Sequence, residues 1–260
     1  MAVVLLTNNS NRGQTLAHLI QRAGLDLRLV VVEDPSINVS AEKGILPLTK
    51  KFLGPTYRWL KARFSLSAEE RKALRFEEEC MQKANARVEA YIKELGVTGR
   101  PEGITYLEAA SLHEAGVITA VTKAEPDVCV VLGTSILKDR MISIPKIGTI
   151  NAHTSILPEY RGARSEFWQC YNQHYDHVGM TIHLIDNGID TGNILFQKKQ
   201  DVGSNPEPFE LRANNTLATL QNYVQVLQSV LGGTAKPTQQ GNCTTPTYRF
   251  KDITEERRVK

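Results

Sequence analysis

Apolar runs alternate with amphipathic segments along most of this chain. Residues 3–7 and 128–132 are unbroken apolar runs, which are typical of parallel strands covered on both faces. Between residues 3–7 and a second run at 27–32, apolar side chains recur at helical spacing, and Gly24 is placed to end that helix. This alternation predicts an α/β fold with a Rossmann-like, mainly parallel twisted sheet flanked by helices.

The same alternation resumes after residue 102. Further strands are expected at 103–107, 147–151, 180–185 and 194–202, and further helices at 111–124, 166–173 and 209–231. A polar turn is expected at 8–13, after the first strand. We therefore expect one domain over residues 1–231, followed by a short polar C-terminal extension at 232–260.

Residues 41–99 interrupt this pattern as a helical insertion. Ser67 with Glu70 three positions later predicts a capping box, and an apolar stripe at three- and four-residue steps follows it as far as Leu95. We expect the insertion to pack on the sheet or on a partner subunit, which leaves a homodimer possible.

Composition narrows the function classes. The chain has 260 residues, 41% of them hydrophobic, and a net charge of +3. This balance argues against a dedicated nucleic-acid or membrane-surface binder. The apolar run near the N-terminus is too short for a signal peptide or a membrane span, and the four cysteines form no C-x-x-C pair. We expect a cytoplasmic protein with reduced thiols.

Polar side chains follow the predicted strand at 147–151. In the stretch GTINAHTSILPEYRG, residues 148–162, Asn151 and His153 are two positions apart and so point to the same side of the strand. An amide donor beside an imidazole suits acyl transfer, in which a carbonyl becomes an oxyanion and an amine loses a proton. Taken alone, the pair could equally satisfy backbone groups where the chain leaves the sheet.

A second polar segment follows the strand at 180–185. Gly188, Asp190 and Gly192 form an acidic turn in which the glycines permit close backbone approach. Asp190 could orient His153 and support proton transfer. Asp186 and Asp190 could instead be ordinary turn formers.

Other chemistries have weaker support. His174 and His177 lie in a polar loop without further metal-ligand motifs, so no metal site is expected. There is no G-x-S-x-G elbow, G-x-G-x-x-G fingerprint or P-loop. His183 lies within a predicted strand and is interpreted as a packed, hydrogen-bonded core residue.

The two polar segments together carry a family resemblance. Asn-x-His-x-Ser-x-Leu-Pro with Tyr-Arg-Gly, followed by Gly-x-Thr-x-His and Gly-Ile-Asp-Thr-Gly, resembles the catalytic domain of 10-formyltetrahydrofolate-dependent formyltransferases, over residues 103–231 and more loosely over 1–33. The resemblance implies that Asn151, His153 and Asp190 are catalytic and that 10-formyltetrahydrofolate is the co-substrate, with no metal. It also implies that the folate contacts Leu132, Gly133, Thr134, Ile136, Leu137, Ile185, Asp186 and Gly188.

The resemblance favours one class of acceptor. Only residues 232–260 follow the last long helix, fewer than the barrel that tRNA-formylating members carry, and the loop after the first strand lacks the glycines of the purine-pathway members. The family's sugar N-formyltransferases remain, so the expected acceptor is a nucleotide-linked amino sugar. A 4-amino-4,6-dideoxy sugar on a nucleoside diphosphate, as in lipopolysaccharide O-antigen biosynthesis, fits best.

The chain departs from the family pattern at Arg164, Ser165 and Glu166, where small and apolar residues are usual. Arg164 could bind a diphosphate and Glu166 a sugar hydroxyl or amine. The full set of expected substrate-binding residues is Asn9, Ser10, Arg12, Tyr160, Arg161, Arg164 and Glu166. Formylation of methionyl-tRNA or another small amine, hydrolysis of formyltetrahydrofolate, and folate binding without catalysis remain alternatives.

Overall fold

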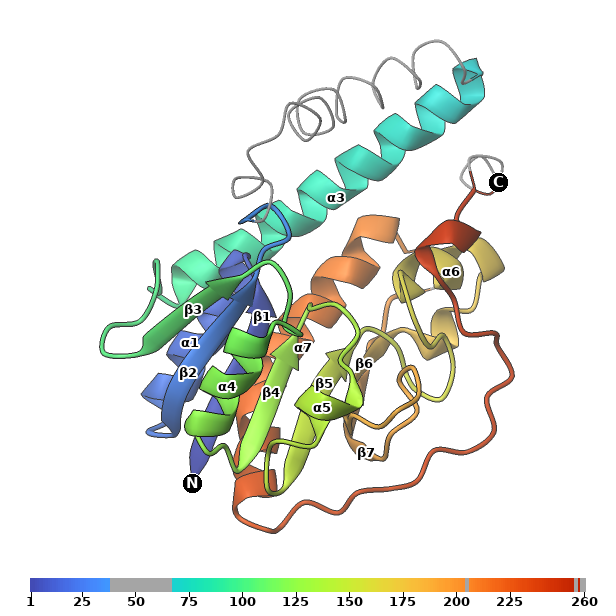
Figure 1. The fold of residues 1–260 in the computed structure, drawn as a ribbon. Helices are drawn as coiled ribbons and strands as arrows, with labels where there is room; N and C mark the ends of the chain where they lie inside the picture. Colours follow the sequence, from blue (N-terminus) through green and yellow to red (C-terminus); the bar gives the residue numbers. More distant parts are fainter. Residues whose placement is uncertain (38–66, 204–205, 255–256, 258–260) are drawn as a thin grey trace.

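A single mixed sheet organises the computed structural model, which describes residues 1–37, 67–203, 206–254 and 257. Within this part of the chain the strand order is β3-β2-β1-β4-β5-β6-β7 (Figure 1). The strands are β1 Ala2–Asn8, β2 Asp26–Glu33, β3 Thr105–Ala109, β4 Val128–Leu132, β5 Gly148–His153, β6 Gly179–Leu184 and β7 Ile194–Lys199. The helices are α1 Asn11–Arg22, α3 Ala68–Glu94, α4 Ala115–Lys123, α5 Asp139–Ile142, α6 Ser165–Asn172 and α7 Pro208–Leu231, with 3-10 turns η2 Tyr175–His177 and η3 Phe250–Asp252.

The predicted α/β class and mainly parallel sheet are confirmed. In the order β3-β2-β1-β4-β5, each strand pairs in parallel with the next. β6 and β7 then pair antiparallel at one edge. Parallel central strands explain the unbroken apolar runs, because both faces of β1 and β4 are covered.

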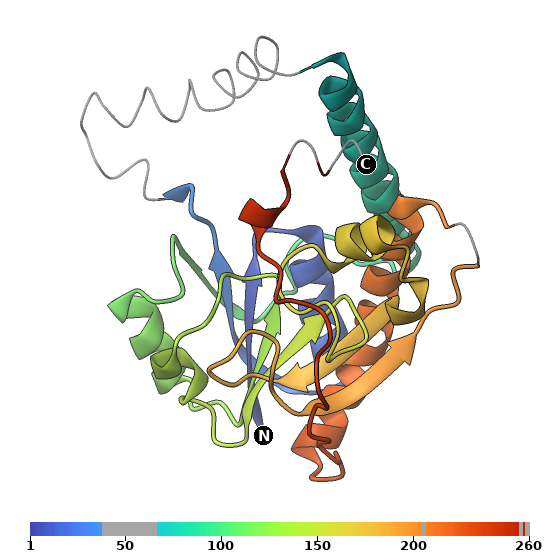
Figure 2. The ribbon, with the colours of Figure 1, turned by 90° about the vertical axis from the view of Figure 1, so that its right-hand side faces the viewer.

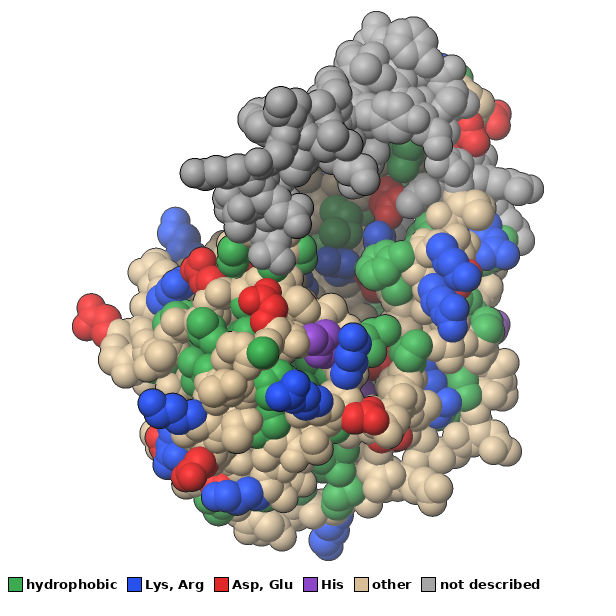
Figure 3. All heavy atoms as spheres, viewed as in Figure 1, with side chains coloured by type: hydrophobic (Ala, Val, Ile, Leu, Met, Phe, Trp, Pro, Cys, Tyr) green, Lys and Arg blue, Asp and Glu red, His purple; other side chains and the backbone are tan. Residues whose placement is uncertain are grey.

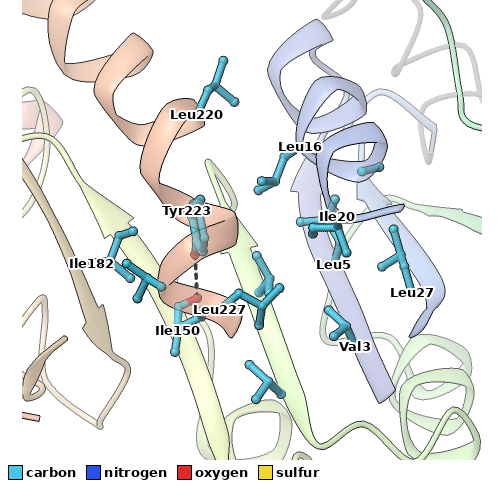
Figure 4. Packing of buried hydrophobic residues seen from close by; sticks show 14 of the residues in the cluster. Val3, Leu5, Leu16, Ile20, Leu27, Ile150, Ile182, Leu220, Tyr223 and Leu227 are labelled. Atoms are coloured by element: carbon cyan, nitrogen blue, oxygen red, sulfur yellow. Dashed lines mark hydrogen bonds between the residues drawn. The ribbon is translucent and has the colours of Figure 1, made fainter. Parts of the chain in front are cut away.

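Helices cover both faces of the sheet. α1 and α7 enclose one core cluster with the inward side chains of the central strands, while α4 and α5 cover the opposite face (Figure 1). Figure 4 shows Tyr223 of α7 among the aliphatic side chains of the first cluster. Its hydroxyl donates to the carbonyls of Val131 and Ile150, at 2.8 and 3.0 Å, so it ties α7 to β4 and β5 just before the strands end.

The long helix α3 begins at the predicted capping box. Ser67 Oγ accepts from the Glu70 backbone N–H at 3.1 Å, and the Glu70 carboxylate accepts from the Ser67 N–H at 2.6 Å. Ala84 and Val88 are its buried residues, and the helix packs against α7. Residues 41–66 of the predicted insertion lie outside the described residues. Neither α3 nor any other helix in the described part is long and apolar enough to cross a membrane.

Several predicted boundaries were wrong. Helix α1 begins at Asn11, which leaves a shorter turn than 8–13, because Ser10 caps it by accepting from the Gly13 N–H at 3.4 Å. Helix α4 begins at Ala115 rather than at residue 111, since residues 111–114 form a turn in which Glu114 accepts from the Ser111 N–H. Strand β7 ends at Lys199, before residue 202. Gly24 follows α1 with φ of 71°, in agreement with its predicted role.

Candidate active site

The two polar segments meet at the edge where the parallel strands end. Asn151 and His153 lie on β5, and their register partners on antiparallel β6 are His183 and Thr181. In an open α/β sheet, ligands bind beyond the carboxyl ends of the parallel strands. The predicted strand at 147–151 corresponds to β5, so the amide and the imidazole lie at the expected edge.

Asp190 completes this cluster from the turn between β6 and β7. Its Oδ2 lies 3.4 Å from Nδ1 of His153, and its Oδ1 lies 3.5 Å from Nε2 of His183. The side chain of Asp190 is 14% exposed and that of His153 is 8% exposed, so the pair lies largely out of bulk water. The three side chains singled out from the sequence are thus neighbours in space.

The surroundings of Asp190 keep its carboxylate ionised. Burial alone would raise its pKa, but the opposing charge of His153, the hydrogen bond from His183 and the N–H of Gly162 at 2.8 Å outweigh burial and hold the pKa well below the usual range. The backbone of Asp190 has φ of 52°, a left-handed conformation that Asp tolerates better than most residues. Charge and backbone geometry both direct this carboxylate at the imidazole of His153.

The other nitrogen of His153 faces the loop after β5. Nε2 lies 2.8 Å from the carbonyl oxygen of Tyr160 and 3.1 Å from Oγ of Ser165. Since a carbonyl only accepts, Nε2 carries a proton and donates it to Tyr160. The ring is therefore fixed on both sides, and Nδ1 is the nitrogen that can exchange a proton next to Asp190.

His183 belongs to the same cluster. It is 2% exposed and its Nδ1 lies 2.8 Å from the Leu184 carbonyl, which agrees with the interpretation as a packed, hydrogen-bonded residue. Its Nε2 lies 3.3 Å from Nδ2 of Asn151 and close to Asp190, a contact that the sequence reading missed. The available signal was the equal spacing of Asn151–His153 and Thr181–His183 on two predicted strands.

Together these groups can assist the attack of an amine on a carbonyl. The half-buried amide of Asn151 can donate to a developing oxyanion, while an imidazole next to an ionised carboxylate can accept and release a proton.

The residues expected to hold the folate lie in two loops beside this cluster. Residues 132–137 follow β4, the parallel neighbour of β5, and Ile136 is 71% exposed. The buried carboxylate of Glu33 anchors this loop by accepting from the N–H and the hydroxyl of Ser135, both at 2.7 Å. In the second loop Asp186 is a turn former, since Oδ1 accepts from the Gly188 N–H at 3.0 Å and from Thr191 Oγ1 at 2.5 Å.

Four of the expected substrate residues lie in polar networks. Arg164 Nη2 pairs with Glu77 Oε1 at 2.7 Å, and Glu166 Oε1 pairs with Arg212 at 2.7 Å. Burial and then the charge of Arg212 lower the pKa of Arg12, whereas Glu166 opposes this shift, so Arg12 lies in the field of both. Arg161 donates to Gln240 Oε1 at 2.7 Å.

The prediction that the Tyr160 side chain contacts substrate is wrong. Tyr160 is 0% exposed, its ring stacks on Tyr248, and its hydroxyl lies 2.7 Å from His174 Nδ1. Its contribution to the site is the backbone carbonyl that meets His153. Asn9 is exposed and its Nδ2 lies 3.4 Å from Asp34, while the hydroxyl of Ser10 is occupied in capping α1.

A cavity of about 610 Å³ lies between α3, α6 and the start of α7. Its lining combines aromatic and apolar side chains with basic ones, among them Phe76, Phe167, Tyr171, Phe209, Lys72, Arg164, Arg212 and Arg257. In Figure 3 the surface is hollowed beside the end of the sheet, and hydrophobic, basic and acidic side chains line the hollow. Arg164 and Glu166 on its wall flank Ser165, whose hydroxyl contacts His153, so the cavity adjoins the cluster.

Comparison with solved structures shows the same fold. The N-formyltransferase of Helicobacter canadensis, solved with folinic acid and dTDP-3-aminofucose, aligns with a TM-score of 0.56 at 16% identity, over 98% of this chain and 73% of that one. Glycinamide ribonucleotide transformylase 1 from Symbiobacterium toebii aligns with a TM-score of 0.57 at 14% identity, over 93% and 94% of the two chains.

The curated proteins that match this chain by sequence are more similar to it than these solved structures are. The methionyl-tRNA formyltransferase of Alkaliphilus metalliredigens is 31% identical over 144 residues, which cover 55% of this chain and 45% of that protein. The enzyme of the same name from Citrifermentans bemidjiense is 28% identical over 160 residues, 60% of this chain and 50% of that protein. The chain spans about half the length of the curated relatives it matches. A family model described as formyl transferase matches residues 69–227, more than half of the chain, including both polar segments. The chain belongs to the formyl transferase family.

Proposed function

We propose that this formyltransferase transfers the formyl group of 10-formyltetrahydrofolate to the amine of a nucleotide-linked amino sugar. Membership of the family gives the reaction type. The observation that carries the assignment of residues is the approach of Asp190 to His153, 3.4 Å between Oδ2 and Nδ1, beside Asn151 on the same strand.

In the proposed mechanism, the sugar amine attacks the formyl carbon and a new N–C bond forms. Asn151 donates its amide N–H to the carbonyl oxygen, which becomes an oxyanion in the tetrahedral intermediate. His153 takes the proton that the amine loses and delivers it to N10 of the folate as the bond between N10 and the formyl carbon breaks. Asp190 stabilises the imidazolium that exists between these two transfers.

The folate would lie against the loops at 132–137 and 185–188. Both loops lie next to the cluster, and exposed Ile136 offers an apolar contact for a flat heterocycle. The anchor that Glu33 provides at Ser135 supports a preformed loop at this position.

The cavity between α3, α6 and α7 supports a nucleotide-linked acceptor. Aromatic rings such as Phe167 and Tyr171 can stack on a base, and the guanidinium groups of Arg164 and Arg212 can face a diphosphate. Burial and then the charge of Arg212 destabilise the charged form of Arg12, which would gain from an anion placed between the two guanidinium groups. In Helicobacter canadensis the related fold was solved with dTDP-3-aminofucose.

Methionyl-tRNA is the second candidate acceptor. It is favoured by the names of the curated relatives, which match this chain at 28–31% identity over 144–160 residues. On this alternative the basic side chains at the cavity would meet RNA phosphates instead of a diphosphate.

One experiment separates these acceptors. The protein is incubated with 10-formyltetrahydrofolate carrying a ¹³C-labelled formyl group. Parallel reactions contain, in addition, one of a panel of nucleoside diphosphate amino sugars, methionyl-tRNA, or no acceptor. We expect one amino sugar to gain the labelled formyl group by mass spectrometry, and the Asn151→Ala variant to lose this transfer. Formylation of methionyl-tRNA alone would establish the alternative, and folate turnover without acceptor would indicate a hydrolase.

A further inference from the structure

The segment after α7 crosses the loop that follows β5 and the turn between β6 and β7. From Thr238, which pairs with Ile194 at the start of β7, it runs to Tyr248, which pairs with Gly162 in the loop after β5. Figure 2 shows this segment, in red, passing over the body of the molecule toward η3. We call residues 238–248 the C-terminal strap.

Gln240 is the point at which the strap touches the turn that carries Asp190. Its Nε2 donates to the carbonyl oxygens of Asp190 and Gly192, at 2.8 and 2.7 Å. Its Oε1 accepts from Arg161 Nη2 at 2.7 Å. One side-chain amide thus joins the turn after β6 to the loop after β5, the two loops that meet at His153.

Further contacts fix the strap to the loop after β5. The buried carboxylate of Glu159 accepts from the N–H groups of Thr244 and Thr245, at 2.9 and 2.8 Å. Tyr248 donates its N–H to the Arg161 carbonyl at 2.9 Å. A Cβ at Gly162 would lie 2.0 Å from the Tyr248 carbonyl oxygen, so glycine is required where the strap approaches most closely.

These contacts act on the backbone that aims Asp190. The turn has left-handed φ at Asp190, and its carboxylate also accepts from the N–H of Gly162. Gln240 belongs to the strap and Gly162 pairs with Tyr248 of the strap, so these two partners of the turn depend on it. Without Gln240, two carbonyls of the turn lose their donor, and the left-handed conformation loses the contact that stabilises it.

We propose that Gln240 is a positioning residue for formyl transfer, which acts by holding the 190–192 turn so that the Asp190 carboxylate meets Nδ1 of His153. This inference rests on the proposed catalytic role of Asp190. It adds Gln240, which lies outside both polar segments, to the residues on which formyl transfer depends. Gln240 contacts no reacting atom on this account, so its effect must be visible on Asp190 itself.

The first test measures the ionisation of the Asp190 carboxyl group directly. Its side-chain ¹³C resonance is followed by NMR against pH in the wild-type protein, in Gln240→Met and in Gln239→Met. Gln239 is an exposed neighbour on the same strap, and its replacement is the matched control. The charged and polar groups that face Asp190 are His153 on β5, His183 on β6 and the Gly162 N–H.

We expect the wild type and Gln239→Met to keep an ionised Asp190 down to the acid limit of folding. In Gln240→Met the carboxyl should titrate visibly, with a pKa shifted up toward that of an ordinary aspartate, because its partners are no longer held in place. An unchanged titration in a folded Gln240→Met protein overturns the proposal. If Gln240→Met does not fold, Gln240→Asn replaces it, since the shorter amide cannot span both loops, and the same upward shift is required.

The second test uses the reaction. Gln240→Met should lower kcat by about tenfold or more while changing the KM for the folate much less, since a misplaced catalytic group affects the chemical step rather than ground-state binding. A raised KM with unchanged kcat would assign Gln240 to binding and overturn positioning. Because the NMR measurement needs no acceptor, a failure of the proposed acceptor assignment leaves the positioning test intact.

Discussion

Nδ2 of Asn151 lies 3.3 Å from Nε2 of His183, its register partner on the neighbouring antiparallel strand. Nδ1 of His183 faces the Leu184 carbonyl at 2.8 Å and must therefore carry a proton. Nε2 then accepts from Asn151 when the ring is neutral and donates to Asp190 when the ring is charged. In the neutral state of His183 this hydrogen bond occupies one N–H of the Asn151 amide and leaves the other N–H for an acceptor.

Replacement of His183 should therefore impair catalysis through Asn151. We expect His183→Ala to lower kcat by about ten- to a hundredfold, because the donor to the oxyanion is no longer fixed in orientation. His18→Ala, on the outer surface of α1, is the control and should retain wild-type turnover. Full activity in a folded His183→Ala protein would separate His183 from the reaction.

Replacement of Asn151 or of Asp190, two of the three proposed catalytic residues, should have a large effect on turnover. Asn151→Ala and Asp190→Asn are each expected to reduce turnover by at least about a hundredfold. Asn can adopt the left-handed backbone of residue 190, so Asp190→Asn should fold normally. Single-turnover rates and melting curves of both variants test this, and near-normal rates in either one contradict the mechanism.

Acid should weaken the fold partly through Asp190. A carboxyl whose pKa is lower in the folded than in the unfolded protein stabilises the fold above its unfolded pKa, near 3.9 for Asp, and this contribution is lost as the pH falls toward the folded value. The free energy of unfolding of wild type minus that of Asp190→Asn should thus be larger at about pH 5 than below about pH 4. Urea denaturation across this range measures the difference, which a pH-independent gap would contradict.

Replacement of Arg164 tests whether the acceptor binds in the cavity between α3, α6 and α7. Arg164→Gln should raise the KM for the nucleotide-linked sugar by about tenfold while leaving that for the folate nearly unchanged, because a charge-assisted contact with a diphosphate is lost. Arg28→Gln, a surface residue at the far end of β2, is the control. Since Arg164 also pairs with Glu77, melting curves must show that α3 and α6 remain packed. An unchanged KM for the sugar would remove Arg164 from the acceptor site.

The predictable parts of this molecule are those with a local signal. The apolar runs of β1 and β4 identify buried parallel strands without any knowledge of their neighbours, and the Ser67 capping box marks the start of α3. Asn151, His153 and Asp190 could be grouped because each follows a strand end and the two motifs resemble one family.

The missed parts depend on pairings between distant segments. His183 joins the site only because β6 pairs antiparallel with β5 in a register that places it opposite Asn151. The sequence does not show that the ring of Tyr160 is buried, because Tyr248, which stacks on it, lies 88 positions later in the chain. Gln240 lies in a polar segment without periodicity, and only the folded chain brings it to Asp190.

If Gln240 positions Asp190 as proposed, the C-terminal strap also sets when the candidate active site can be complete. A polypeptide emerges from the ribosome from its N-terminus, so the sheet, α7 and both motifs are all made before residues 238–248. Up to that point the turn bearing Asp190 lacks Gln240, and the loop bearing Arg161 lacks Tyr248. A nascent chain could therefore form the sheet before this short segment docks on the two loops.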